Sequence, residues 1–338
     1  MGAQEATTER AAAARADAPA QGSRLPAWTR TAAKSFNRLA SSKLARTMVT
    51  VAILVIAALL IRGELKTSKF SDVTRAMAAT PPWALAACVG LTVGTYLCEA
   101  VLEWHVLKFI GKPLKLGRTL LAASAASALS IAMGFGIASG TAARLRFYAF
   151  AKLTAADVAK VTALVSGALF LAGLGALGLS GFGGLSTIGR ILHWPSWAVA
   201  ALSAVLLAAV PGWFLLLRRF RGKDPDAMDG KARAITLACG LGNWLFQGAA
   251  MFVLAAHHLS DFPGFFAAFT LASLFGSAVG VPADLGVLEA AVMGSGSLGS
   301  AHQAAAALVL YRLIFQVIPM ILALLVMGGR QLGKLVRR

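Results

Sequence analysis

Apolar stretches long enough to cross a membrane alternate with short basic segments along most of this chain. A helix of about 20 apolar residues spans a bilayer. The pattern predicts spans at about 47–61, 83–107, 161–183, 197–217, 234–256 and 303–327. Between the first two, 62–82 mixes charges with apolar positions at helical spacing, which predicts a helix at the membrane interface. We expect 184–195 to lie on the same outer side.

Two further apolar stretches, 116–152 and 263–299, are interrupted by glycine and proline. Basic clusters flank the first stretch at both ends, which favours a hairpin that enters the membrane and returns to the same face. A single tilted span with one basic outer loop is the alternative. We expect Gly134, Gly136 and Gly140 at the hairpin tip, because such a turn needs residues free to take a positive φ. Further breaks fall at Gly280, Pro282, Gly286 and Pro319.

These elements predict an all-α polytopic membrane protein with about six full spans plus two re-entrant helical hairpins. The halves 47–183 and 197–328 have the same order, span, span, hairpin, span, but they start from opposite sides of the membrane. This is the plan of inverted repeats, which place a substrate between broken elements near the bilayer midplane. The symmetry rests on hydropathy alone.

Composition excludes a soluble protein of this length. Of 338 residues, 58% are hydrophobic and 14% are charged, with a mean hydropathy of +0.72. The net charge of +18 does not require nucleic acid, because 26 of the 32 lysines and arginines lie in segments predicted to be cytoplasmic. We therefore expect both termini in the cytoplasm. The tails 1–46 and 329–338 are basic, and the first, which we expect to be disordered, either sets the topology or contacts anionic headgroups.

Metal and cofactor chemistry is not indicated. The three cysteines form an odd number inside apolar runs, and the five histidines have no ligand spacing. Neither a phosphate-binding glycine loop nor a nucleophile elbow occurs. We expect no metal and no cofactor.

Charged side chains inside or beside the predicted spans are the candidate functional residues, because lipid alone does not stabilise them. Glu99 and Glu103 are four residues apart and share a helix face, although Glu103 lies near the end of its run and could instead reach the headgroups. Arg312 is the only basic residue within a span, so we expect it to pair with Glu99 or Glu289. The candidate substrate-binding residues are Glu99, Glu103, Arg144, Arg146, Tyr148, Asp284, Glu289, Tyr311 and Arg312.

Three segments resemble the transmembrane, flippase-like region of bacterial lysylphosphatidylglycerol synthases, also called multiple peptide resistance factors, and of their stand-alone relatives. They are ASGTAARLRFYAF (138–150), VPADLGVLEAAVM (281–293) and LVLYRLIFQVIPMILAL (308–324). The family pattern falls on Arg144, Arg146, Phe147, Tyr148, Pro282, Gly286, Glu289, Tyr311, Arg312 and Pro319. The break 282–286 is Pro-Ala-Asp-Leu-Gly, where such relatives commonly have Pro-Gly-Gly-Leu-Gly, so the identity of the substrate stays open.

The resemblance covers about 47–328 and implies a protein of the bacterial inner membrane that binds a lipid or moves it between leaflets, with an anionic or aminoacylated phospholipid as the expected substrate. A crossing phosphate loses its hydration, and guanidinium groups can replace it. Arg144 and Arg146 would then capture the headgroup, and Arg312 would hold the buried phosphate or only pair with a carboxylate. Tyr148 and Tyr311 would orient the headgroup or serve as core aromatics.

Two-domain relatives carry a soluble C-terminal aminoacyltransferase domain, whereas this chain stops about ten residues after its last predicted span. We therefore expect no lysyl transfer and no enzyme activity. The alternative function is a non-transporting membrane scaffold for an enzyme of lipid or cell-envelope glycan synthesis, which would need the tails and loops but not the buried charges. The expected partners are membrane lipids, with a second copy of the chain or a lipid-synthesis enzyme as protein partners.

Overall fold

The computed structural model describes residues 70–133, 136–148, 151, 153–221, 230–255, 262–279, 284, 286–294, 301–323 and 325. These parts are helical, and no strand occurs among them. The predictions for the first span, both tails, Gly134, Gly280 and Pro282 lie outside the described residues.

Five described helices are long and apolar enough to cross a membrane, which confirms an all-α polytopic membrane protein. They are α5 (Pro82–Phe109), α8 (Ala155–Gly183), α11 (Gly230–Ala255), α12 (Phe262–Val279) and the helix Gln303–Ala323, which comprises most of α14 (Ala301–Arg312), the π-helix η4 (Leu313–Val317) and the turns after it. A sixth span results if α9 (Leu185–Leu192) and α10 (Ser196–Arg221) form one broken crossing. The predicted interfacial segment contains α4 (Phe70–Ala78).

The predicted outer segment 184–195 contains a short helix that hydropathy did not indicate. Residues Leu185–Leu192 form α9, which is bent by 106° from the first part of α10. Thr187 and Ile188 are buried, and His193 ends the helix in the left-handed region with a φ of 57°. An eight-residue helix has too few turns to show a helical period in sequence, so hydropathy did not reveal it.

The first predicted hairpin consists of two helices, α6 (Leu116–Met133) and α7 (Gly136–Tyr148), that pack against each other, with α6 also on α5 and α7 also on α8. Gly140 does not lie at the tip as predicted, because it falls inside α7. A Cβ at this position would lie 2.5 Å from the Ser130 hydroxyl oxygen and 2.9 Å from Arg144 Nη1. The glycine is therefore needed for the close approach of α7 to α6.

Replacing Gly140 with alanine is expected to destabilise the fold by about 1–3 kcal/mol, because the added methyl overpacks the contact between α6 and α7. The measurement is the free energy of unfolding in detergent. Gly90→Ala is the matched control, since a Cβ there meets nothing within 4 Å, and this variant should be neutral or slightly more stable. Equal effects of the two substitutions would contradict the packing role.

The second predicted hairpin is represented by α12 and α13 (Val287–Gly294), which also pack against each other. Between them, Asp284 and Gly286 adopt left-handed φ values of 54° and 78° and redirect the chain. The Asp284 carboxylate forms a hydrogen bond with Ser273 and occupies the space that a side chain at position 276 would need. At 18 residues, α12 alone meets the length of a crossing, so re-entry of either hairpin stays a prediction.

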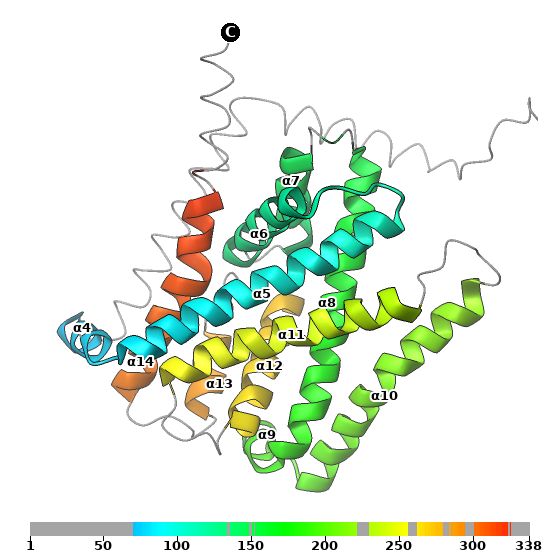
Figure 1. Ribbon diagram of the computed structural model, residues 1–338. Helices are drawn as coiled ribbons and strands as arrows, with labels where there is room; N and C mark the ends of the chain where they lie inside the picture. Colours follow the sequence, from blue (N-terminus) through cyan, green and yellow to red (C-terminus); the bar gives the residue numbers. More distant parts are fainter. Residues whose placement is uncertain are drawn as a thin grey trace, which may run out of the picture. The chain divides into compact units, whose positions relative to one another are not determined.

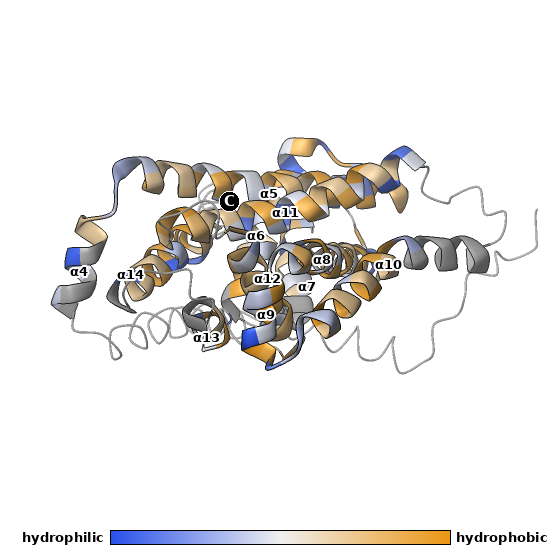
Figure 2. Ribbon diagram, turned by 90° about the horizontal axis from the view of Figure 1, so that it is seen from below, coloured by the Kyte–Doolittle hydropathy of each residue, from blue (hydrophilic) through white to orange (hydrophobic). Residues whose placement is uncertain are grey.

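Helices α5 and α11 lie alongside each other (cyan and yellow in Figure 1), and the view from below in Figure 2 shows the same pair. Asn243 of α11 donates a hydrogen bond to the Thr95 carbonyl of α5 at 3.3 Å. Helix α8 contacts α10, α11 and α12, and Trp244 of α11 donates to its Leu169 carbonyl at 2.8 Å. Helix α14 packs on α11 and α4.

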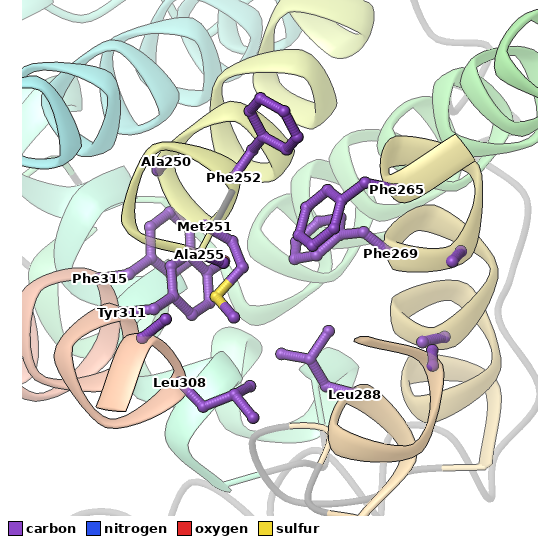
Figure 3. Packing of buried hydrophobic residues seen from close by; sticks show 14 of the residues in the cluster. Ala250, Met251, Phe252, Ala255, Phe265, Phe269, Leu288, Leu308, Tyr311 and Phe315 are labelled. Carbon is purple, nitrogen blue, oxygen red and sulfur yellow. The ribbon is translucent and has the colours of Figure 1, made fainter. Parts of the chain in front are cut away.

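A chain of aromatic rings runs through a cluster of buried residues that joins α11, α12 and the last span (Figure 3). Phe252 contacts Phe265 with ring centroids 5.3 Å apart, and Phe265 stacks on Phe269 at 6.3 Å. Phe269 meets the edge of Tyr311 at 6.2 Å, and Tyr311 stacks on Phe315 at 5.0 Å. These contacts fix the position of the π-helix relative to α12.

Candidate functional site

The faces of α5 show the reverse of a soluble amphipathic helix. Val89, Val93 and Leu97 form an exposed apolar stripe at four-residue spacing, as expected of a surface that contacts lipid. The buried side instead carries polar and charged residues, namely Thr92, Thr95, Tyr96, Glu99 and Glu103. Helix α5 therefore directs its polar groups into the protein, where other helices have to satisfy them.

Glu103 of α5 is completely buried and is bound by two side chains of α7. Arg144 Nε lies 3.0 Å from each carboxylate oxygen, and Arg144 Nη2 lies 2.7 Å from Oε2. The Tyr148 hydroxyl donates to Oε1 at 2.6 Å. Arg144 and Tyr148 are four residues apart on one face of α7, so a single helix supplies both donors. The alternative that Glu103 reaches the headgroups was therefore wrong.

Glu99 lies one turn before Glu103 and is 5% exposed. It accepts a hydrogen bond from the Ser127 hydroxyl of α6. Arg144 Nη2 is 3.9 Å from Glu99 Oε1, which is an ionic contact beyond hydrogen-bond distance. Glu99, Glu103, Ser127, Arg144 and Tyr148 are called the α5–α7 cluster below. It contains two carboxylates and one guanidinium.

Small residues bring the three helices of this cluster together. The side of α6 that faces the protein is rich in alanine, and the buried ones are Ala122, Ala123, Ala125, Ala126 and Ala128. Small side chains let helix backbones approach closely in a membrane protein. Together with Gly140 of α7, they allow short polar side chains such as Ser127 to reach across to α5.

A second ion pair joins α13 to the last span. Arg312, the final residue of α14, is 4% exposed, and its Nη2 binds Oε1 of Glu289 in the first turn of α13. The structure therefore pairs Arg312 with Glu289, one of the two partners predicted from sequence. An unpaired arginine at the bilayer centre costs roughly 2.5–3.5 kcal/mol or more, so such a partner is expected in any buried site.

The π-helix η4 follows directly on Arg312. Pro319 has no N–H to donate to the carbonyl of Phe315 four residues earlier. The Tyr96 hydroxyl of α5 donates to that carbonyl instead, at 3.0 Å. Gln316 is buried, and its Oε1 has no hydrogen-bond partner among the described residues. π-helical turns are frequent at functional sites, so this segment belongs to the candidate site.

Replacing Tyr96 with phenylalanine is expected to cost about 1–3 kcal/mol of stability, because the buried Phe315 carbonyl loses its donor. The measurement is the free energy of unfolding in detergent. Pro319→Ala supplies an N–H four residues after Phe315, so the same Tyr96 substitution should cost clearly less in that background. An unchanged cost there would contradict the role of the hydroxyl.

Six of the nine predicted site residues fall into two ion-paired groups, the α5–α7 cluster and the pair of Arg312 with Glu289. Tyr96 lies between the two groups. It is one turn from Glu99 on α5, and its ring stacks on Phe315, which is one turn after Arg312. Arg146 is half-buried and lies on a different face of α7 from Arg144, outside the α5–α7 cluster. Tyr311 is a buried core aromatic that also forms a hydrogen bond with Gln247.

Sequence reasoning missed Tyr96, Ser127 and Gln316. Pro319 inside a predicted span was the available signal, because a helical proline leaves the carbonyl four residues earlier, that of Phe315, without an N–H donor. Nothing in the sequence identifies Tyr96 as the replacement donor. No group of three or more potential metal ligands occurs in the part of the chain that the structure describes.

Comparison with known proteins places these observations in a family. The family model described as the lysylphosphatidylglycerol synthase TM region matches residues 48–323. An uncharacterised protein of Synechocystis sp., slr0712, is 25% identical over 299 residues, which cover 86% of this chain and 92% of that protein. The inner membrane protein YbhN of Escherichia coli is 24% identical over 260 residues, covering 72% of this chain and 78% of YbhN.

Proposed function

The chain belongs to the family of lysylphosphatidylglycerol synthase transmembrane regions, and on that premise we propose that it moves an anionic or aminoacylated phospholipid between the leaflets of the inner membrane. The name of YbhN as an inner membrane protein supports the location. The excess of basic residues in the predicted inner segments supports cytoplasmic termini.

The observation that carries this proposal is the buried Arg144 of α7, which is held by the buried carboxylate of Glu103. A phospholipid that crosses the bilayer needs a replacement for the hydration of its phosphate. A guanidinium binds phosphate in the same two-pronged way as it binds carboxylate. Glu103 therefore acts as a stand-in for the phosphate while the site is empty, and an arriving headgroup displaces it.

The second ion pair extends this argument to the other half of the chain. In each half, the second helix of the predicted hairpin carries a charge that pairs with a spanning helix: Arg144 of α7 with Glu103 of α5, and Glu289 of α13 with Arg312 of α14. We propose that the halves are inverted repeats and that the two pairs open in turn. Opening one pair while the other stays closed would give access from alternate sides.

The test is reconstitution of the full chain into vesicles that contain a trace of fluorescent phosphatidylglycerol. An impermeant reductant reports the fraction of headgroups in the outer leaflet over time. Protein-containing vesicles should exchange the probe between leaflets, and protein-free vesicles should not. Lack of movement for phosphatidylglycerol and for its aminoacylated form would overturn the proposal and favour a non-transporting scaffold.

A further inference from the structure

The α5–α7 cluster holds one more carboxylate than guanidinium. Arg144 gives its hydrogen bonds in this cluster to Glu103, which also receives the Tyr148 hydroxyl. Among the described residues, Ser127 alone donates a hydrogen bond to Glu99, and Arg144 lies 3.9 Å from it. The single positive charge of the cluster is therefore used by Glu103, and Glu99 is the surplus acid.

Few other groups act on Glu99. Among the described residues, the charged or titratable ones are Arg144 of α7, Glu103 of the same helix and Tyr96 one turn away. Helix α6 contributes the Ser127 hydroxyl, which carries no charge. Helices α8 and α11 and the π-helix also pack on α5, but none of their described side chains supplies a charge near Glu99.

If Glu99 were ionised as well, two buried carboxylates would have to share the single guanidinium of Arg144. Burial of such a charge costs several kcal/mol, and a nearby like charge adds to that cost. The cluster must therefore take up one positive charge. A proton needs only one carboxylate oxygen, and the Ser127 hydroxyl beside Glu99 can satisfy the protonated group. We propose that Glu99 is a proton-binding site and that the protein couples proton uptake to binding of an anionic headgroup at Arg144.

The coupling, which rests on the proposed function, follows from counting charges. In the empty site, protonated Glu99, ionised Glu103 and Arg144 sum to zero. When Arg144 leaves Glu103 for a phosphate, Glu103 loses its counter-charge and has to take a proton in turn. One proton then accompanies each singly charged headgroup. Headgroup binding is expected to strengthen as the pH falls, by up to about tenfold per pH unit for one proton.

Infrared spectroscopy of the full chain in lipid tests the proton site without any transport. A protonated carboxyl has a C=O stretching band that a carboxylate lacks. Glu99→Gln should remove one protonated carboxyl at neutral pH. Glu103→Gln should remove one as well, because Glu99 then becomes the partner of Arg144. Glu289→Gln is the control and should leave the band unchanged, because its carboxylate already has Arg312 as counter-charge.

An unchanged intensity of the band in Glu99→Gln would overturn the proton site. A wild-type band that appears only when sodium is removed would overturn it as well, because sodium would then be the cation that neutralises the cluster. For the coupling, the same vesicles receive a pH gradient. Phosphatidylglycerol should accumulate in the leaflet toward which protons flow. The double variant Glu99→Gln with Glu103→Gln should abolish this accumulation, because neither acid can then take up the coupled proton, whereas Glu99→Gln alone should keep it. Movement that ignores the gradient would overturn the coupling and leave the proposed function standing. If no lipid moves at all, the proposed function fails, and with it the coupling, while the infrared result still decides the proton site.

Discussion

Vesicles that contain Arg312→Gln should move fluorescent phosphatidylglycerol about ten- to a hundredfold more slowly than vesicles with the unchanged protein. A hydrogen bond to a charged group is worth about 1.5–3 kcal/mol, and a buried phosphate that loses this donor has no water to replace it. The substitution leaves Glu289 without its guanidinium, but Glu289 is only half-buried, with 22% of its side chain exposed. The free energy of unfolding should therefore fall only slightly, while the rate of lipid movement falls about ten- to a hundredfold.

An exchange of the two charges separates transport from architecture. Arg312→Glu combined with Glu289→Arg keeps an ion pair between α13 and the last span. If Arg312 binds phosphate from its place beside the π-helix, the double variant should regain stability in detergent and remain unable to move lipid. Recovery of both stability and movement would mean that the pair only fixes the position of α13.

Hydropathy predicted most of the helices because the requirement for a span, about 20 apolar residues, is local in the sequence. The spacing of Glu99 and Glu103 likewise predicted that both side chains share one face of α5, where they are buried. Partner choice was not predictable in the same way. Whether Arg312 meets Glu99 or Glu289 depends on how the last span packs against α5 and α13, and hydropathy carries no information about that packing.

Other features depend on contacts between segments far apart in the chain. In the sequence, Tyr96 is one more aromatic residue in a predicted span. Its hydrogen-bond partner, the carbonyl of Phe315, lies 219 positions later in the chain. Gly140 reads as a turn residue because glycine serves both in turns and in close helix contacts. In this fold the second use applies, and only the position of Ser130 on α6 shows it.

Removal of Arg144 should destabilise the protein more than removal of Glu103, although the two form one ion pair. Arg144→Met leaves the ionised carboxylate of Glu103 buried without a counter-charge, which is expected to cost about 3–5 kcal/mol. Glu103→Gln leaves Arg144 with a second acid, since Glu99 is already 3.9 Å from its Nη2. That variant should lose only about 1–3 kcal/mol, the cost of imperfectly replaced hydrogen bonds.

The comparison uses the free energy of unfolding in the same detergent for both variants and for the double variant Glu99→Gln with Glu103→Gln. The double variant removes both acids and strands the guanidinium, so its loss should rise to that of Arg144→Met. An isolated pair would give equal losses for Arg144→Met and Glu103→Gln and no extra loss from Glu99. The order expected here therefore measures whether Glu99 can replace Glu103 as the partner of Arg144.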